Sequence, residues 1–170
     1  MSSLNAVLTA WVRGTYVGSN DLAAVQAEFN SLPKTEITLT PGTSSGNADL
    51  IFMDTRTISA SSSENLDMAG SLTDPLGATL TFATIKAIYV KASSGNTNNV
   101  VVGGAGSNTL LGIFSDATDK IVVKPGGVFM WVAPATGAAV TASTGDILLV
   151  ANSSSGSSVT YDIVIIGTSA

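Results

Sequence analysis

Few side chains in this sequence could carry out chemistry. The 170 residues include no histidine and no cysteine, which excludes a His general base, a Ser-His-Asp triad, a thiolate nucleophile and His- or Cys-ligated metal sites. The remaining candidates are the carboxylate pairs Asp116/Asp119 and Glu64/Asp67, a glycine-rich segment at 102–107, and lysines among many serines without a Ser-x-x-Lys motif. Each of these lacks part of the pattern that its chemistry requires.

The carboxylate pairs do not form a recognisable metal or catalytic motif. A calcium loop of the EF-hand type needs several oxygen ligands at fixed spacings and a bidentate Glu, and neither pair is followed by such a series. Local turns, in which Asp accepts from nearby backbone N–H groups, explain Asp116 and Asp119 more simply. Glycoside hydrolysis also uses two carboxylates, but no aromatic-lined motif accompanies them. We therefore expect no catalytic residue, no metal and no cofactor, and a protein that is not an enzyme.

The segment Val102-Gly-Gly-Ala-Gly-Ser107 has the composition of a phosphate-binding loop without its context. Phosphate binding requires a helix after the loop, whose N-terminus holds the anion. Residues 109–114 instead have the pattern of a strand, and no Gly-Lys-Ser/Thr follows. The segment therefore predicts a tight hairpin that needs flexible φ angles.

Composition indicates one domain with a polar but weakly charged surface. Apolar residues make up 45% and charged residues 11% of the chain, and 22 Ser and 20 Thr supply most of the polarity. The net charge of −5 disfavours nucleic-acid binding, which rewards clustered Lys and Arg. The chain begins without a basic, signal-like region, and its apolar runs are far shorter than the ~20 residues of a membrane span. We expect neither nucleic acid nor membrane as a partner.

Residues 1–48 differ from the rest and are predicted to form an N-terminal arm with one short helix at about 20–31. Leu22, Val25 and Phe29 fall at i, i+3 and i+7, and the residues at 19–21 can cap the N-terminus. Pro33 would end the helix. The stripe could dock on its own domain or on a neighbour. Trp11 and Tyr16 could act as aromatic anchors, again either on the same domain or on a neighbour.

After the arm, residues 49–170 are predicted to form an antiparallel β-sandwich. A strand at 34–40 and a turn at 41–47 lead into short strands separated by Gly, Ser, Asn and Asp, which favours a sandwich or barrel. The predicted strands are 49–58, 64–68, 79–91, 99–103, 109–114, 120–124, 128–133, 146–151 and 159–167. Pro125-Gly126 predicts a type II turn.

Two of these strands are apolar on both faces. The stretches 128–132 and 163–166 show no polar alternation, although one face of a sandwich strand is normally exposed to water. Their outer faces therefore need a cover, either the N-terminal segment or another subunit. We expect at least some contact between subunits.

Residues 64–168 resemble a group of structural proteins of tailed-bacteriophage virions. The resemblance lies in packing and turn patterns at 66–77, 80–90, 119–127, 140–148 and 161–168. It implies a jelly-roll-like sandwich on the outside of the head, and it carries over no catalytic residue. The first 48 residues lie outside it, so it leaves the mode of attachment open.

The expected function is that of a capsid cement or decoration protein in the virion. It would bind the major capsid protein as a homotrimer and bridge capsomers, with Trp11, Tyr16, Leu22, Val25 and Phe29 as the contact residues. The alternative is a receptor- or glycan-binding module of a head fibre or tail, although the predicted loops are rich in Ser, Gly and Asn instead of aromatic residues.

Overall fold

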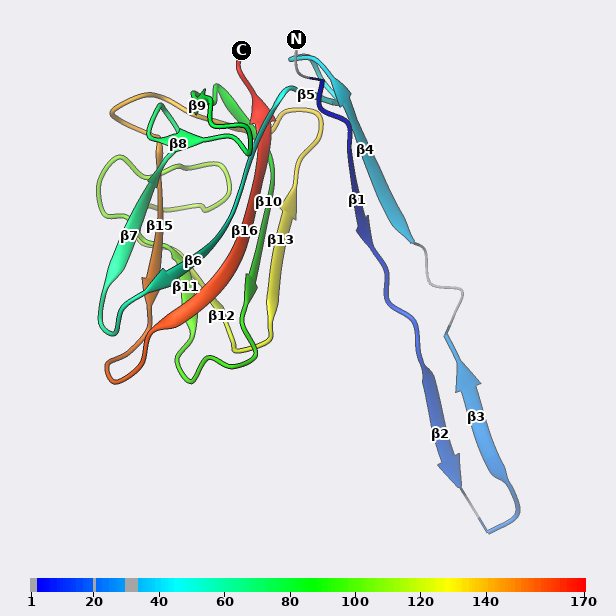
Figure 1. Cartoon of the computed structure of the whole chain (residues 1–170). Helices are drawn as coiled ribbons and strands as arrows, with labels where there is room; N and C mark the ends of the chain where they lie inside the picture. Colours follow the sequence, from blue (N-terminus) through cyan, green and yellow to red (C-terminus); the bar gives the residue numbers. More distant parts are fainter. Residues whose placement is uncertain (1–2, 20, 30–33) are drawn as a thin grey trace.

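Every regular element in the described part of the chain is a β-strand (Figure 1). The structure, a computed structural model, describes residues 3–19, 21–29 and 34–170. The strands are β1 (Ala6–Ala10), β2 (Thr15–Ser19), β3 (Ala24–Glu28), β4 (Thr35–Pro41), β5 (Asn47–Ala48), β6 (Leu50–Ile58), β7 (Ser63–Asp67), β8 (Leu72–Thr73), β9 (Thr79–Leu80), β10 (Thr84–Ala92), β11 (Val100–Gly103), β12 (Lys120–Val123), β13 (Val128–Val132), β14 (Ala138–Ala139), β15 (Ile147–Asn152) and β16 (Val159–Thr168). The predicted all-β class is confirmed.

Two antiparallel sheets form the body of the molecule, residues 47–170. The sheet next to the arm, here the arm-side sheet, has the order β13-β10-β16-β6, with β14 also paired to β10. The other, here the distal sheet, has the order β12-β11-β15-β7. The first long strand of the body thus lies beside the last, β6 beside β16, and the second beside the second-last, β7 beside β15.

The main core lies between the two sheets. Alternate residues of β16 point inward, with Tyr161, Ile163 and Ile165 fully buried. They pack in one apolar cluster with side chains of both sheets, among them Ile88, Val90, Val100, Val102, Leu148 and Val150. Short apolar strands between turn residues explain why most body strands could be predicted.

Local turn chemistry also follows the sequence. Gly126 has φ 75°, and the N–H of Gly127 donates to the carbonyl of Lys124 at 2.8 Å, as expected of a type II turn with Pro125 at its second position. The turn connects β12, in the distal sheet, to β13, in the arm-side sheet.

The predicted strand at 109–114 is wrong. Apart from one bridge between Thr109 and Ile147, this segment pairs with none of the described strands, and Gly112 has φ 95°. Leu110 and Phe114 are buried in the main core, so their apolar character reflects loop side chains that fill the core without strand pairing. The hairpin predicted at 102–107 is therefore also wrong, because β11 pairs instead with β12 across a long loop.

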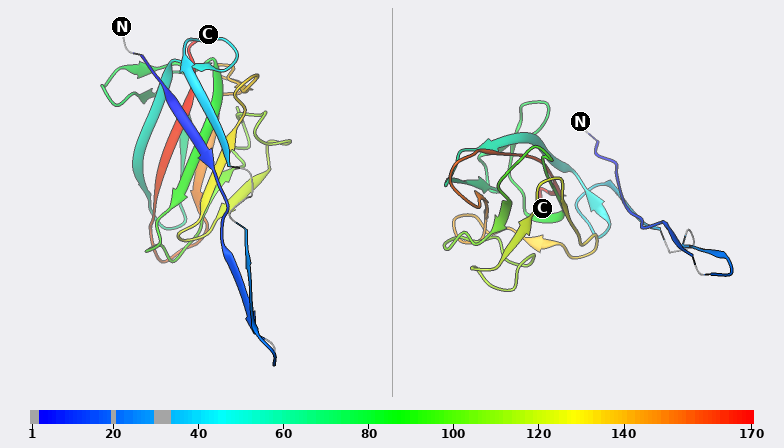
Figure 2. Two further views of the ribbon diagram at one scale, coloured as in Figure 1. Left: turned by 90° about the vertical axis from the view of Figure 1, so that its right-hand side faces the viewer. Right: turned by 90° about the horizontal axis from the view of Figure 1, so that it is seen from below.

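The N-terminal segment is a long two-stranded arm that projects from the body (Figure 2). At its base β1 pairs with β4, and farther out β2 pairs with β3. The end of β4 pairs in parallel with β5, which joins the arm to the body. The tip extends beyond the far end of the body.

The helix predicted at about 20–31 is wrong, because residues 24–28 form strand β3. Val25 and Phe29 fit a helical stripe, but together with Ala27 they also fit the two-residue period of a strand. Pairing with β2 satisfies the backbone of β3 along its length, whereas an isolated ten-residue helix is marginal in water. Residues 20, 30 and 31 of the predicted helix, and Pro33, predicted to end it, lie outside the described residues.

Candidate docking surfaces

The base of the arm covers part of the outer face of the arm-side sheet. Leu8 of β1 and Leu39 of β4 face the sheet, and Leu39 is fully buried. They pack against Ala87 and Ile166, which form a second apolar cluster outside the main core. The N-terminal segment of the same chain is therefore one cover of the two-sided apolar strands.

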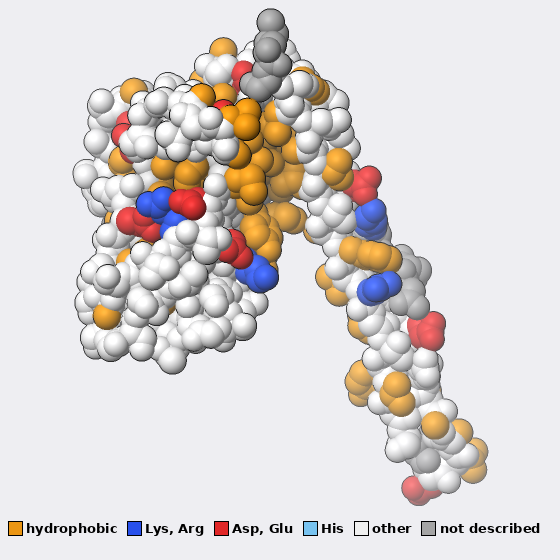
Figure 3. All heavy atoms as spheres, in the orientation of Figure 1, with side chains coloured by type: hydrophobic (Ala, Val, Ile, Leu, Met, Phe, Trp, Pro, Cys, Tyr) orange, Lys and Arg blue, Asp and Glu red, His pale blue; other side chains and the backbone are white. Residues whose placement is uncertain are grey.

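The next row of the same sheet face is only partly covered, because its two middle residues are half-buried and its two outer residues are exposed. Strand register places Met53, Val164, Tyr89 and Met130 side by side across β6, β16, β10 and β13. We call these four residues the open row. Met53 is 54% and Met130 36% exposed, and Val128, at the edge of the next row, is also exposed. Figure 3 shows hydrophobic side chains along the side of the body that faces the arm.

The outer half of the arm has one apolar face. Cross-strand pairs share a face of a hairpin, and here Tyr16 lies opposite Ala27 and Gly18 opposite Val25. The N–H of Phe29 donates to the carbonyl of Gly14 at 2.9 Å, which continues the ladder on this face. We call Tyr16, Val25, Ala27 and Phe29 the tip face; all four are exposed. The opposite face pairs Thr15 with Glu28 and Val17 with Gln26, and is mostly polar.

The structure brings three of the five predicted contact residues together. Tyr16, Val25 and Phe29 lie on the tip face, although on strands and not on a helix. Leu22 lies in the turn at the end of the arm and is 97% exposed. Trp11 lies between β1 and β2, where the guanidinium of Arg13 stacks 4.9 Å from its ring centroid.

Sequence reasoning found half of the open row. The two-sided stretches at 128–132 and 163–166 included Met130 and Val164, but Met53 and Tyr89 gained meaning only from the register that aligns them. The sequence held one signal for Met53. It is apolar and stands two residues after Ile51, so the two side chains lie on the same side of the strand, where Met53 is exposed and Ile51 joins the second apolar cluster.

A polar network ties the two sheets together at one edge of the body. The hydroxyl of the buried Tyr161 donates to Glu64 Oε1 at 2.9 Å, and Arg56 Nε donates to Glu64 Oε2 at 2.6 Å. Arg56 also donates to Asp54 at 2.9 Å. Burial, and then the charge of Glu64, raise the pKa of the Tyr161 phenol. Since Tyr161 is fully buried, the network has the arrangement of a structural clamp.

The raised pKa of Tyr161 predicts a loss of stability in alkali. Above about pH 10 the unfolded chain loses the phenol proton while the folded chain keeps it, so the free energy of unfolding should fall by about 1.4 kcal/mol per pH unit from this group. Urea unfolding at pH 8 to 11.5, followed by Trp fluorescence, measures this slope. For Tyr161→Phe, the free energy of unfolding should fall less steeply with pH above pH 10. Tyr16→Phe, on the arm, should show the same slope as the wild type. Equal slopes for wild type and Tyr161→Phe would contradict the assignment.

The carboxylate pair at 116–119 is used locally. Asp116 Oδ1 accepts from the backbone N–H of Thr118 at 2.9 Å, and Asp119 Oδ2 accepts from that of Asp116 at 2.8 Å. The hydrogen bonds from Thr118 lower the pKa of Asp116. The predicted turn role is confirmed, and the residues that the structure describes hold no group of three or more metal-ligating side chains.

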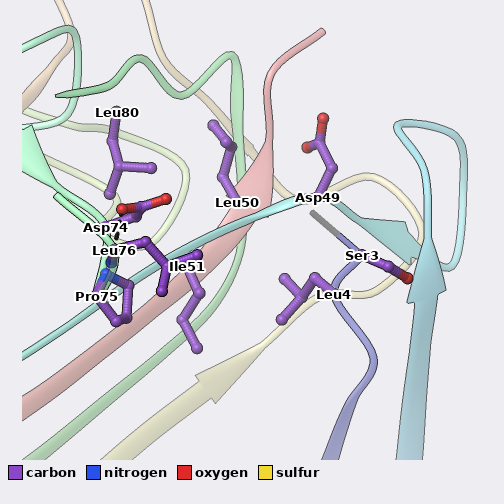
Figure 4. A pocket seen from close by; sticks show the side chains of 9 residues that line it. All are labelled: Ser3, Leu4, Asp49, Leu50, Ile51, Asp74, Pro75, Leu76 and Leu80. Carbon is purple, nitrogen blue, oxygen red and sulfur yellow. Dashed lines mark hydrogen bonds between the residues drawn. The ribbon is translucent and has the colours of Figure 1, made fainter. Parts of the chain in front are cut away.

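A mostly apolar pocket of about 240 Å³ lies at the end of the body near the start of the arm (Figure 4). Its lining residues are Ser3, Leu4, Asp49, Leu50, Ile51, Asp74, Pro75, Leu76 and Leu80. Both of its carboxylates have local partners: Asp49 accepts from the N–H of Ser169, and Asp74 from those of Leu76 and Ala78, each at 2.8 Å. The pocket therefore offers apolar surface without a reactive group.

Comparison of the chain with family models, with curated proteins and with solved structures finds no match. The described residues also form no helix long and apolar enough to cross a membrane. The function has to be inferred from the surfaces themselves, of which the tip face and the open row are the most distinctive.

Proposed function

We propose that this chain is a structural protein of a virion, a capsid cement or decoration protein that works as a homotrimer. It binds the outer surface of the head, formed by the major capsid protein, and bridges capsomers. The observation that carries the proposal is the arm, which projects from the body and exposes the apolar tip face.

The physical chemistry of the arm favours docking on a neighbour. A two-stranded hairpin alone is at best marginally stable in water and needs a further apolar surface. The base of the arm has such a surface in its own body, and the tip has none that buries Tyr16, Val25 or Phe29. A neighbouring subunit that covers the tip face would supply it, and many copies on one shell would add their affinities.

The body supports the same proposal. The strand orders β6-β16-β10-β13 and β7-β15-β11-β12 fit a jelly-roll sandwich, in which first and last strands are neighbours. Jelly rolls occur in viral capsid proteins and in lectins. A glycan-binding module would favour aromatic side chains on the loops of the body, whereas the exposed aromatic residues among those described, Trp11, Tyr16 and Phe29, lie on the arm.

A shortened arm tests the proposal. Replacing residues 11–34 by Asn-Gly joins Ala10 directly to its partner Thr35 through a two-residue hairpin turn and keeps the base of the arm on the body. We expect a folded protein that has lost at least 90% of its occupancy on shells assembled without it, measured by co-sedimentation. Full occupancy of the shortened protein would refute attachment through the arm.

Two valines of the tip provide a matched pair. Val25 lies on the tip face and Val17 on the opposite face of the same hairpin, and both are exposed. Val25→Ser should weaken shell binding about tenfold, which corresponds to about 1.4 kcal/mol, while Val17→Ser should change it less than twofold. Equal effects would show that the apolar face is not the contact.

A further inference from the structure

The open row is an apolar surface that adjoins the contact between the base of the arm and the arm-side sheet. The adjoining row, Ile51, Ile166, Ala87 and Val132, lies under the base of the arm in the second apolar cluster. That cover, strands β1 and β4, uses aliphatic side chains at alternate positions. The same sheet face thus continues from a row covered by an arm to a row whose ends, Met53 and Met130, are exposed, while Val164 and Tyr89 between them are half-buried.

The arm of the same chain turns away from the open row. It leaves the sheet after its base, and its tip extends past the far end of the body in both views (Figures 1 and 2). No described residue of β2 or β3 is buried. Each copy therefore carries a partly exposed apolar strip on its sheet and an exposed apolar strip on its arm.

We propose that the open row binds the tip face of a second copy of this chain, so that protomers exchange arms. The inference rests on the proposed function only in taking the arm as a docking element. It names the surface on which the arm docks, so that shell binding depends on the tip face through the assembly that the exchange holds together. Tyr16, Val25 and Phe29 of the incoming arm would cover Met53, Tyr89 and Met130.

The chemistry of the two strips is matched. The open row carries no charge, so burying it requires no desolvation of an ion. The long thioethers of Met53 and Met130 adapt to aromatic rings such as those of Tyr16 and Phe29 and interact favourably with them. Beyond the row, Lys91 lies at the exposed edge of this surface opposite Asp162 on the neighbouring strand. A polar rim beside an apolar strip is the usual plan of a protein interface.

Each copy takes part in the contact with two different surfaces. Tip face and open row are different patches, so every copy both gives an arm and receives one. Where the rotation between copies closes, such an exchange forms a reciprocal pair or a small ring, and the homotrimer of the proposed function is the ring of three.

Cross-linking of the free protein tests the exchange directly, because the chain contains no cysteine. Tyr16→Cys protein and Met130→Cys protein, differing in tag mass, are mixed and treated with a short bis-maleimide. We expect a covalent heterodimer. Controls are Tyr16→Cys mixed with Val122→Cys, on the exposed side of the distal sheet, and Val17→Cys mixed with Met130→Cys; both should give at least tenfold less product.

The double variant Tyr16→Cys/Met130→Cys, diluted before treatment, distinguishes the arm of a second copy from the arm of the same chain. A link within one chain that forms at all dilutions would show that the arm folds onto its own body, and would overturn the exchange. Sedimentation gives a second readout: the wild type should have a multiple of the 17.1 kDa chain mass, and Met53→Asp, at an exposed position, should raise the dissociation constant at least tenfold.

The two proposals fail in different ways. A wild type that is monomeric and gives no heterodimer overturns the exchange, and loss of shell binding by the shortened arm would then assign the tip to the shell itself. A heterodimer with undiminished shell binding by the shortened arm would support the exchange and refute attachment through the arm.

Discussion

Gly103→Ala is expected to lower the free energy of unfolding by about 4 kcal/mol. Gly103 ends β11 with φ 102°, a conformation that strains residues with a side chain. An added Cβ would also lie 2.5 Å from the carbonyl oxygen of Asp119 and 2.9 Å from the ring of Phe114. Backbone strain and overpacking therefore act together. Since domains are stable by only about 5–15 kcal/mol, urea unfolding should show a large shift of the midpoint.

Gly106 is the matched control in the same glycine-rich segment. It has φ 75°, but nothing lies within 4 Å of its Cβ position. Gly106→Ala should therefore introduce backbone strain without overpacking, and lower the free energy of unfolding by about 1 kcal/mol. If both variants lose equal stability, the close packing of Gly103 against the 104–119 loop is not the cause.

Leu39→Ala is expected to cost about 3 kcal/mol and to loosen the base of the arm. Leu39 is fully buried on β4, beside its cross-strand partner Ala6 on β1 and against the arm-side sheet. Truncation would leave a cavity in the second apolar cluster, where the arm meets the body. Hydrogen exchange should then accelerate in β1 and β4 more than in β10 or β16, because the main core is untouched.

Val7→Ala separates this contact from general effects on the arm. Val7 is 59% exposed and lies on the opposite face of β1, paired with Thr38. The substitution should change the free energy of unfolding by less than about 0.5 kcal/mol and leave exchange in β4 unchanged. Loss of protection in β1 and β4 that is equal for Val7→Ala and Leu39→Ala would contradict the docking of the base through Leu39.

The body could be predicted largely from sequence because its strands obey a local rule. Tyr161, Ile163 and Ile165 alternate with residues that face outward, and Pro125-Gly126 encodes its own turn. Such signals depend on neighbours in the sequence only. The segment 109–114 misled because loop residues such as Leu110 and Phe114 fill the core without pairing.

The arm and its surfaces could not be predicted, because they depend on distant pairing. Val25 and Phe29 satisfy both a helical and a strand period, and only the partner strand at 15–19 decides between them. The open row depends on the register of four strands and on the point at which the arm leaves the sheet. Sequence alone predicts Tyr16 as an aromatic anchor and Val25 and Phe29 as a helix stripe, without the hairpin face that joins them.

Both ends of the described chain emerge at the same end of the body. Ser3 and Asp49 line one pocket, and the backbone of Ser169 donates to Asp49. The arm points toward the opposite end (Figure 1). A fluorescent protein or antigen genetically fused after Ala170 would therefore be carried on the side away from the tip. Cargo display and arm engagement would then use opposite poles of the molecule and would not obstruct each other.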